Sequence, residues 1–331
     1  MSTTTQTTTY VMQGSPQRTY LMKTYYDKKL LETAKTQLCY AQFAQKRSMP
    51  RNGGKTVEWR RWNLFDPDDV AELTEGVTPN SQDLSQSHVE ATLKQYGAFV
   101  EISDLLDLTA YDPVQADTAE MIGEQIGIRL DHIVRDVMVA TTNKQIAAGR
   151  AGTANLTSAD VLTVAEIRKA VRTLKKNKAR MFTTAIDGSV RRPHFICICD
   201  PDATYDLQSD SLWQDVSKYS NAEQIYDGEI GRLFGVVFVE STEGKISLHT
   251  ETNPLNSTYD VHHTLVFGAD SYGDVEIGNS GSIEMIVKPA GSSGTADPLN
   301  QRATIAGKVM AYAAAILQPL WLIDIEHVAT A

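Results

Sequence analysis

The chain has 331 residues, of which 42% are hydrophobic and 22% charged, a composition typical of globular proteins and not of wholly disordered ones. Its formal net charge of -10, from 41 acidic and 31 basic residues, disfavours direct nucleic-acid binding by the surface as a whole, because phosphate recognition relies on clustered Lys and Arg. The longest apolar run, residues 311–323, is interrupted by Gln318 and Pro319 and is shorter than the roughly 20 residues that a membrane-spanning helix needs.

The N-terminal part is predicted to be an arm followed by a helix. Residues 1–19 are rich in Thr, Gln and Ser and contain little that could be buried, so we expect a flexible arm. The arm also lacks a basic stretch followed by an apolar run, so we expect no secretory signal and synthesis in the cytoplasm. Apolar residues then recur near helical spacing over residues 23–47, which predicts a helix that ends before Pro50.

Residues 53–69, GGKTVEWRRWNLFDPDD, predict a strand with two mixed faces. Side chains alternate along a strand, so each face carries an indole beside charged groups: Val57, Trp59 and Arg61 on one, and Glu58, Arg60 and Trp62 on the other. Neither face is plainly core or plainly solvent. A second alternating segment, residues 88–104, completes a long hairpin, whose far end is too polar to be buried within its own domain.

Two helices are predicted in the middle of the chain. The strongest pattern covers residues 117–148, where apolar residues recur every three or four positions. Gly123 and Gly127 weaken this helix unless another element packs closely over them. A further helix follows, with Ser158 or Asp160 as its N-cap.

The rest of the chain predicts a compact mixed domain in which strands and short helices alternate. The predicted strands are residues 194–200, 231–242, 263–278 and 282–289. A Gly/Ser linker follows at residues 290–298. Residues 304–331 begin with a strand or helix, end in an apolar strand, and are expected to return to the long helix, so that one subdomain is discontinuous in sequence.

The signatures of catalytic sites are absent from the sequence. It contains no H-E-x-x-H, Walker loop, G-x-G-x-x-G or G-x-S-x-G motif. Cys39, Cys197 and Cys199 lack the spacing of a zinc site and are expected to be buried as small hydrophobes. We therefore predict no catalytic, cofactor-binding or metal-binding residues, although carboxylates far apart in sequence could still meet as an acid and base pair.

Two smaller clusters contain residue types that can bind metal ions. His262 and His263 are consecutive in a predicted strand, point to opposite faces and cannot easily reach one ion, so we expect a solvated or capped pair. The acidic residues around Pro67 lack the pattern of a calcium loop and are better explained by turn formation.

The order of the predicted parts resembles that of tailed-phage major capsid proteins with the Hong Kong 97 type fold. There, an N-arm, an extended E-loop, a spine helix in a peripheral domain and an axial domain follow one another. Two segments resemble the branch named after coliphage N-four: LLETAKTQLCYAQFAQKRSMPRNGGKTVEWRRWN (30–63) and DSLWQDVSKYSNAEQIYDGEIGRLFGVVFVEST (210–242). The resemblance covers most of residues 20–331.

The resemblance implies an α+β chain with this capsid fold. The domains it implies are an N-terminal arm and helix at 1–52, an E-loop β-hairpin at 53–100, a peripheral domain with the spine helix at 101–154 and 295–331, and a mixed α/β axial domain at 155–294.

It also implies a structural function. The chain would be a major capsid protein, not an enzyme, that self-assembles into pentamers and hexamers of an icosahedral head. The head would enclose double-stranded DNA without sequence-specific binding. The resemblance leaves scaffolding, portal and decoration proteins as further partners, and implies no cofactor and no membrane partner.

An E-loop that lies across a neighbouring copy would explain the two mixed faces of the ribbon. Trp and Arg are enriched at interface hot spots. The expected inter-subunit contacts are Trp59, Arg60, Arg61, Trp62 and Phe65.

Two other functions compete with this one. An encapsulin-like nanocompartment shell has the same fold and would hold enzyme cargo. A soluble hydrolase, with carboxylates and histidines scattered through the mixed domain, is a third reading.

The basic residues at 167–180 fit a solvated helix face better than a DNA contact.

Overall fold

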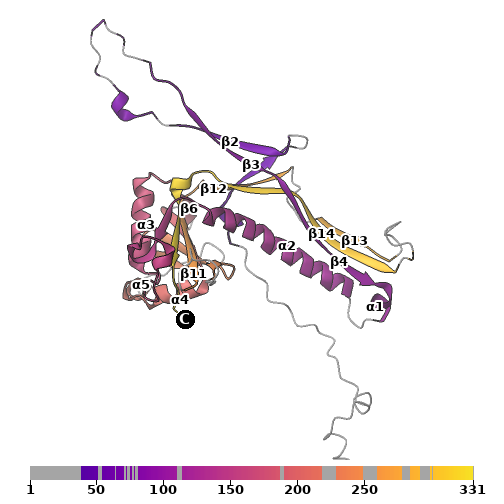
Figure 1. Ribbon diagram of the computed structural model, residues 1–331. Coiled ribbons are helices and arrows are strands. Elements are labelled where there is room, and N and C mark those ends of the chain that lie inside the picture. The colour runs from indigo at the N-terminus through magenta and orange to yellow at the C-terminus, as the bar shows by residue number, and fades with distance from the viewer. Residues whose placement is uncertain are drawn as a thin grey trace, which may run out of the picture. The chain divides into compact units, whose positions relative to one another are not determined.

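Three β-sheets and one long helix organise the described part of the chain (Figure 1). The computed structural model describes residues 39–330 with internal gaps, all within one unit that spans residues 35–331. The gaps are residues 51–53, 64, 71, 73–74, 77, 79–80, 110–113, 187–189, 218–228, 249–258, 278–283, 291–298 and 300. The predicted arm at 1–19, all but the first residue of the predicted linker at 290–298 and most of the predicted helix at 23–47 therefore lie outside the described residues.

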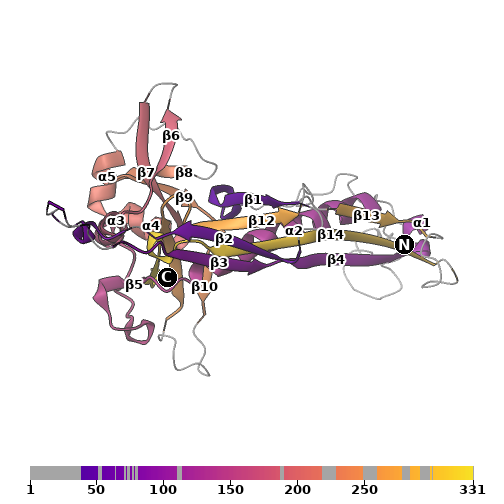
Figure 2. The same ribbon diagram turned by 90° about the horizontal axis from the view of Figure 1, so that it is seen from above.

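The first sheet has five strands and carries the long helix α2 (Val114–Val139). Its strands are β1 (Gln45–Met49), β4 (Lys94–Ser103), β12 (Tyr272–Ile277), β13 (Glu284–Lys288) and β14 (Arg302–Ile316). The order is β1-β12-β14-β13, and β4 pairs with β14 over most of the length of β4 (Figure 2). A short helix, α1 (Asp104–Thr109), follows β4.

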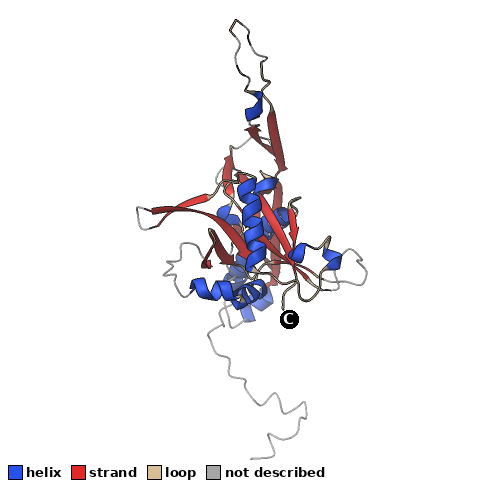
Figure 3. Ribbon diagram, turned by 90° about the vertical axis from the view of Figure 1, so that its left-hand side faces the viewer, coloured by secondary structure: helices blue, strands red, loops and turns tan. Residues whose placement is uncertain are grey.

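The second sheet has eight strands and forms the predicted mixed domain. Its strands are β5 (Lys144–Ile146), β6 (Phe182–Ile186), β7 (Val190–Cys199), β8 (Glu229–Leu233), β9 (Val236–Glu240), β10 (Lys245–Ser247), β11 (Val261–Phe267) and β15 (Leu322–His327). The helices of this part are α3 (Val164–Lys176), α4 (Pro201–Ser209) and α5 (Ser211–Ser217). Helices lie in front of the strands in Figure 3, and α3 packs on β11 and β15.

The third sheet is the hairpin of β2 (Thr56–Trp62) and β3 (Gln86–Thr92). Short 3-10 turns complete the described elements: η2 (Ala41–Phe43), η3 (Pro67–Asp69), η4 (Ala147–Gly149), η5 (Thr153–Asn155) and η7 (Pro319–Trp321).

The long helix packs against the five-stranded sheet at a glycine of β14. A Cβ atom at Gly307 would lie 2.4 Å from Ile126 Cδ1 and 2.7 Å from Ile122 Cγ2, closer than real Cβ contacts. Ile122 and Ile126 are buried in the core that α2 shares with β14. Of the two glycines of the helix, Gly123 has no atom within 4 Å of a Cβ placed there. No element therefore packs closely over Gly123, and the close approach between the helix and the sheet lies at a glycine of the opposing strand.

The predicted helix at 23–47 is wrong for the described residues from Cys39 onward. Residues 41–43 form a 3-10 turn, and Gln45–Met49 form β1, which pairs in parallel with β12. The side chain of Asp131 on α2 accepts hydrogen bonds from the backbone amides of Cys39 and Ala41, at 3.2 and 2.9 Å. Contacts with distant parts of the chain therefore override the local helical spacing.

The two central helices also differ from their predicted limits. Helix α2 ends at Val139 and not at residue 148, because residues 144–146 leave it to pair with β15. The N-cap of α3 is Thr163, so neither Ser158 nor Asp160 caps it. Asp160 instead accepts hydrogen bonds from the Thr157 amide at 2.8 Å and from Arg150 Nε at 2.9 Å.

Strand pairing cuts across the predicted domain boundaries. Strands β12 and β13 fall within the range predicted for the axial domain, yet both pair with β14. Strand β15 falls within the range predicted for the peripheral domain, yet it joins the eight-stranded sheet beside β11. The predicted return of the C-terminal segment to the long helix is confirmed for β14, which packs on α2.

We predict that Gly307→Ala destabilises the protein by about 1 to 3 kcal/mol, because the added methyl group overpacks the contact with Ile122 and Ile126. The matched control is Gly123→Ala, in open space on α2, which is expected to stabilise the helix by up to about 1 kcal/mol. Denaturant unfolding of both variants, followed by circular dichroism, gives the two values. Equal effects of the two substitutions would contradict this packing.

Candidate interaction surface and histidine clusters

The hairpin is anchored on the five-stranded sheet by one of its two faces. In its register Val57 faces Ala91, Trp59 faces Val89 and Arg61 faces Ser87. The apolar residues of this face join Met49, Val275 and the alanines of β14 in one buried cluster. Beyond Trp62, among the described residues, one backbone hydrogen bond, from Asn63 N to Ser85 O at 3.0 Å, continues the ladder.

Trp59 lies in the chain's own core and not on a free surface. Its side chain is only 8% exposed, and its indole Nε1 is buried with no hydrogen-bond partner. The small residues Ala311, Ala313 and Ala315 contribute to the cluster that surrounds it. The sequence interpretation that neither face of the ribbon is core is therefore wrong for the face that carries Trp59.

The opposite face and the far part of the hairpin are exposed. Trp62 is 60% exposed and Phe65 is 52% exposed. On the same face of β2, Arg60 Nε donates a hydrogen bond to Glu58 Oε1 at 3.0 Å. Val70 and Leu84, in the segment between the two strands, are also exposed apolar residues, at 78% and 61%. We call these four exposed apolar residues the outer face of the hairpin.

A cavity of about 260 Å³ lies beside the hairpin base and is lined by several arginines, among them Arg47, Arg60, Arg61 and Arg180. Arg61 donates hydrogen bonds to Ser87 Oγ at 3.0 Å and to the side chain of Gln318, and Arg180 pairs with Asp270 at 2.8 Å.

The tip of the hairpin carries the opposite charge. The tip is the segment between β2 and β3, and its described acidic residues are all exposed: Asp66, Asp68, Asp69, Glu72, Glu75 and Asp83. Asp66 caps the turn η3 by accepting a hydrogen bond from the Asp68 amide at 3.1 Å, as the turn interpretation predicted. The hairpin therefore has an acidic tip and an arginine-rich base.

Beyond Leu93, where the chain passes from β3 to β4, the buried side chains change from odd-numbered to even-numbered residues. Val89, Ala91 and Leu93 point into the hairpin cluster, whereas Tyr96 and Ile102 join the core under α2. The sequence interpretation continued a single alternation across residues 88–104. The structure divides that segment into β3 and β4, which pair with different partners, β2 and β14.

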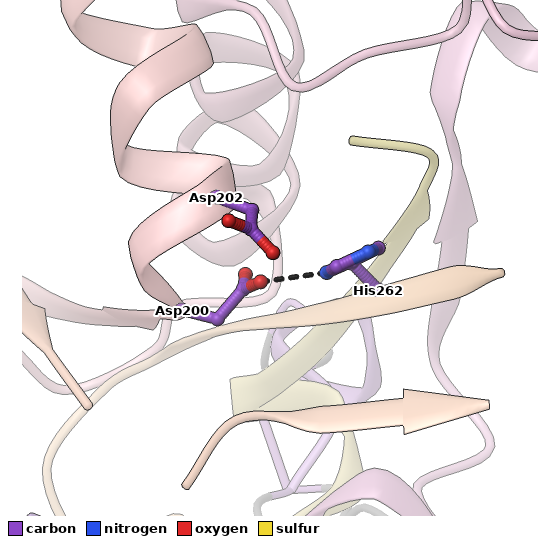
Figure 4. Close-up of side chains that lie close together, drawn as sticks. All are labelled: Asp200, Asp202 and His262. Carbon is purple, nitrogen blue, oxygen red and sulfur yellow. Dashed lines mark hydrogen bonds and ion pairs between the residues drawn. The ribbon is translucent and has the colours of Figure 1, made fainter. Parts of the chain in front are cut away.

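The histidine pair of β11 points to two opposite sides of its sheet, as predicted. His262 Nδ1 lies 2.6 Å from Asp200 Oδ2, and His263 Nδ1 lies 2.9 Å from Asp324 Oδ2. Figure 4 shows the first of these contacts, with Asp202 beside it. Both histidines are buried, with 7% and 6% exposure, so the pair is capped by carboxylates and not solvated.

The charges of the first cluster are set by burial and by the contact between Asp200 and His262. Burial alone would disfavour both charges, but each partner stabilises the other, so the pKa of Asp200 is lowered and the pKa of His262 is raised. The ring of His327 stacks on His262 with centroids 5.9 Å apart. Burial lowers the pKa of His327 to about 4, so that ring is neutral at pH 7.

The second cluster already contains a cation. Lys144 Nζ lies 2.6 Å from Glu326 Oε1 and 3.8 Å from Asp324 Oδ2. Burial would lower the pKa of Lys144, but the two carboxylates outweigh it and raise that pKa. The ammonium group thus lies against both carboxylates of the cluster formed by His263, Asp324 and Glu326.

Sequence reasoning missed the carboxylates of both clusters. Two local signals existed: Asp200 ends the apolar run HFICICD just before Pro201, and alternation in residues 324–327 places Asp324 and Glu326 on one face. Their histidine partners come from another strand, and that pairing is not encoded in any short motif.

Comparisons with known proteins agree with this architecture. Residues 128–274 match the model of a family described as phage capsid protein. The capsid of cyanophage P-SCSP1u superposes with a TM-score of 0.67 at 14% identity, over 95% of each chain. The capsid of Ralstonia phage GP4 gives 0.70 at 11% identity, over 93% of this chain and 96% of that one. The cyanophage Pam1 capsid gives 0.68 at 13% identity, over 95% and 98%. No curated protein sequence matches.

The chain therefore has the Hong Kong 97 type fold of tailed-phage capsid proteins. Together with the family match, this fold identifies a major capsid protein, which is a structural component of the virion head and not an enzyme. The narrower resemblance to the coliphage N-four branch stays a prediction. No helix in the described ranges has the length and apolar character needed to cross a membrane.

We predict that Lys144→Met destabilises the protein by about 1 to 3 kcal/mol at pH 7, because it leaves two buried carboxylates without their cation. The loss is smaller than for a fully buried pair, since the Lys144 side chain is 41% exposed.

The control is Lys245→Met, because Lys245 has similar exposure but faces the exposed carboxylate of Asp136 at 3.7 Å. Denaturant unfolding at pH 7 compares the two variants. A loss as small as that of the control would contradict this assignment.

Proposed function

We propose that copies of this chain assemble into pentamers and hexamers of an icosahedral head that encloses double-stranded DNA, with each hairpin lying on a neighbouring copy. The single observation that supports the hairpin contact is its outer face, defined above, which the chain's own residues leave uncovered. In this assignment the five-stranded sheet with α2 is the peripheral domain and the eight-stranded sheet is the axial domain.

The outer face offers enough apolar surface for a useful contact. A tryptophan side chain buries roughly 150 to 250 Å² when fully covered, at about 25 cal/mol per Å². Because Trp62 is 60% exposed in the single chain, covering the remainder yields about 2 to 4 kcal/mol before ordering costs. Every copy in a shell repeats this contact, so a modest gain for each chain stabilises the whole particle.

Charge complementarity suggests where the tip docks. The exposed carboxylates of the tip have the opposite sign to the arginines around the cavity at the hairpin base. Copies arranged head to tail would place the acidic tip of one chain beside the arginine-rich base of the next. Of the predicted contact residues, Arg60, Arg61, Trp62 and Phe65 remain in this proposal, and Trp59 supports them from within its own chain.

The proposed assembly also has a packaged genome, protein partners and a site of synthesis. The acidic chain, with net charge -10, holds packaged DNA without sequence-specific binding. Synthesis takes place in the host cytoplasm, and scaffolding, portal and decoration proteins are the further partners of such a head. No particular feature of the described residues favours the nanocompartment alternative over a phage head.

We predict that Trp62→Ser prevents or weakens assembly while the chain stays folded, because it removes the largest exposed ring of the outer face. Trp62→Phe is the matched control, since it keeps an apolar ring, and it should still assemble. Sedimentation velocity and electron microscopy of the expressed protein measure particle size, and circular dichroism checks the fold. Normal particles from Trp62→Ser would argue against this role of the outer face.

A charge-swap experiment tests the docking of the tip. Arg60→Glu with Arg61→Glu, or Asp68→Lys with Asp69→Lys, should each reduce particle yield by placing like charges together. The chain that carries all four substitutions should regain yield, because the signs are again complementary. Equal loss in the fourfold variant, measured by sedimentation, would show that tip and base do not meet.

A further inference from the structure

Two aspartates and a histidine form a cluster at the start of α4 (Figure 4). Asp200, Asp202 and His262 each offer one ligand atom, and these atoms all lie within 4.8 Å of one another. Asp200 and His262 are buried, whereas Asp202 is exposed. The cluster therefore combines two fixed groups with one carboxylate that solvent can reach.

One oxygen of the buried carboxylate has no partner. Asp200 is 4% exposed, and its Oδ2 contacts His262 while its Oδ1 is buried without a hydrogen bond. A buried acceptor without a partner costs free energy, more so when it carries charge. A cation bound between the three side chains would satisfy this oxygen.

The surrounding backbone holds Asp200 in place. A Cβ atom at Gly244 would lie 2.6 Å from Asp200 Cβ, so the loop after β9 packs directly against this side chain. The carbonyl of Asp200 also accepts the Thr204 amide hydrogen bond at 3.0 Å, in the first turn of α4. Ligands fixed in this way are what a metal site requires.

The second carboxylate and histidine cluster provides an internal comparison. There the ammonium of Lys144 reaches Glu326 at 2.6 Å. Within the described ranges, Asp200 and Asp202 make no ion pair with a lysine or arginine, and the one ion-pair partner of Asp200 is the imidazole of His262. The first cluster thus has two carboxylates and no lysine or arginine among the described residues, and a metal ion bound there would release the proton that His262 Nδ1 shares with Asp200.

We propose that Asp200, Asp202 and His262 bind a divalent transition-metal ion of the zinc class. Two carboxylate oxygens and one imidazole nitrogen are ligands that Zn²⁺ accepts, with water in the remaining position. Ca²⁺ and Mg²⁺ prefer sites made entirely of oxygen atoms. This site goes beyond the capsid function and does not depend on how the hairpin docks.

Equilibrium dialysis of the chelator-treated, full-length protein against Zn²⁺ alone tests the proposal. We expect one ion per chain, and a Kd weaker by about tenfold or more in Asp202→Asn, an exposed change that spares the core. Asp107→Asn is the matched control, because Asp107 is also an exposed aspartate in the first turn of a helix, and it should keep the natural Kd.

The His262→Gln variant should lose zinc binding while it stays folded. If this buried substitution unfolds the protein, the zinc affinity of the exposed Asp202→Asn variant tests the site instead. X-ray absorption at the zinc edge should show nitrogen and oxygen ligands. Absence of zinc binding, or equal binding by natural protein and Asp202→Asn, would overturn the site. Sulfur ligands would place the ion at cysteines and overturn it as well, and tighter binding of Ca²⁺ or Mg²⁺ would overturn the metal class.

Discussion

The two faces of the β2–β3 hairpin meet different surroundings, and the rest of the account depends on this difference. Trp59 and its neighbours close over the small residues of β14, whereas Trp62 and Phe65 have no such cover in their own chain. A two-stranded ribbon is marginally stable by itself in water. Anchoring one face gives the hairpin a fixed starting point, and the other face is left for a partner.

Strand β14 connects the parts of the chain because its residues serve both sides. Gly307 lets the long helix pack closely on β14, and the alanines at 311, 313 and 315 let the hairpin pack there. The odd-numbered residues up to Val309 pack in the core under the helix, whereas those from Ala311 onward pack in the hairpin cluster. The pairing of β14 with β4 shifts register at this point, between Val309 and Tyr312. The chain then passes through the turn η7 into β15 of the eight-stranded sheet. Small side chains and one irregularity thus allow a single strand to pack against both the long helix and the hairpin.

Local patterns in the sequence predicted the elements whose stability is local. The apolar spacing of α2 and the alternation of the hairpin strands were both visible, and the order of parts suggested the capsid fold. The segment after Cys39 was assigned to a helix because its spacing fits one, but it pairs with β12, more than two hundred residues away. The carboxylate partners of His262 and His263 were missed for the same reason, since strand pairing over long distances brings them together.

Electron cryo-microscopy of assembled particles tests the central claim most directly, because it locates the outer face of the hairpin relative to neighbouring copies. The account predicts that Trp62 and Phe65 are covered by an adjacent chain, while Trp59 stays packed on its own β14. Particles in which Trp62 and Phe65 face solvent, or in which the hairpin contacts only its own chain, would contradict it.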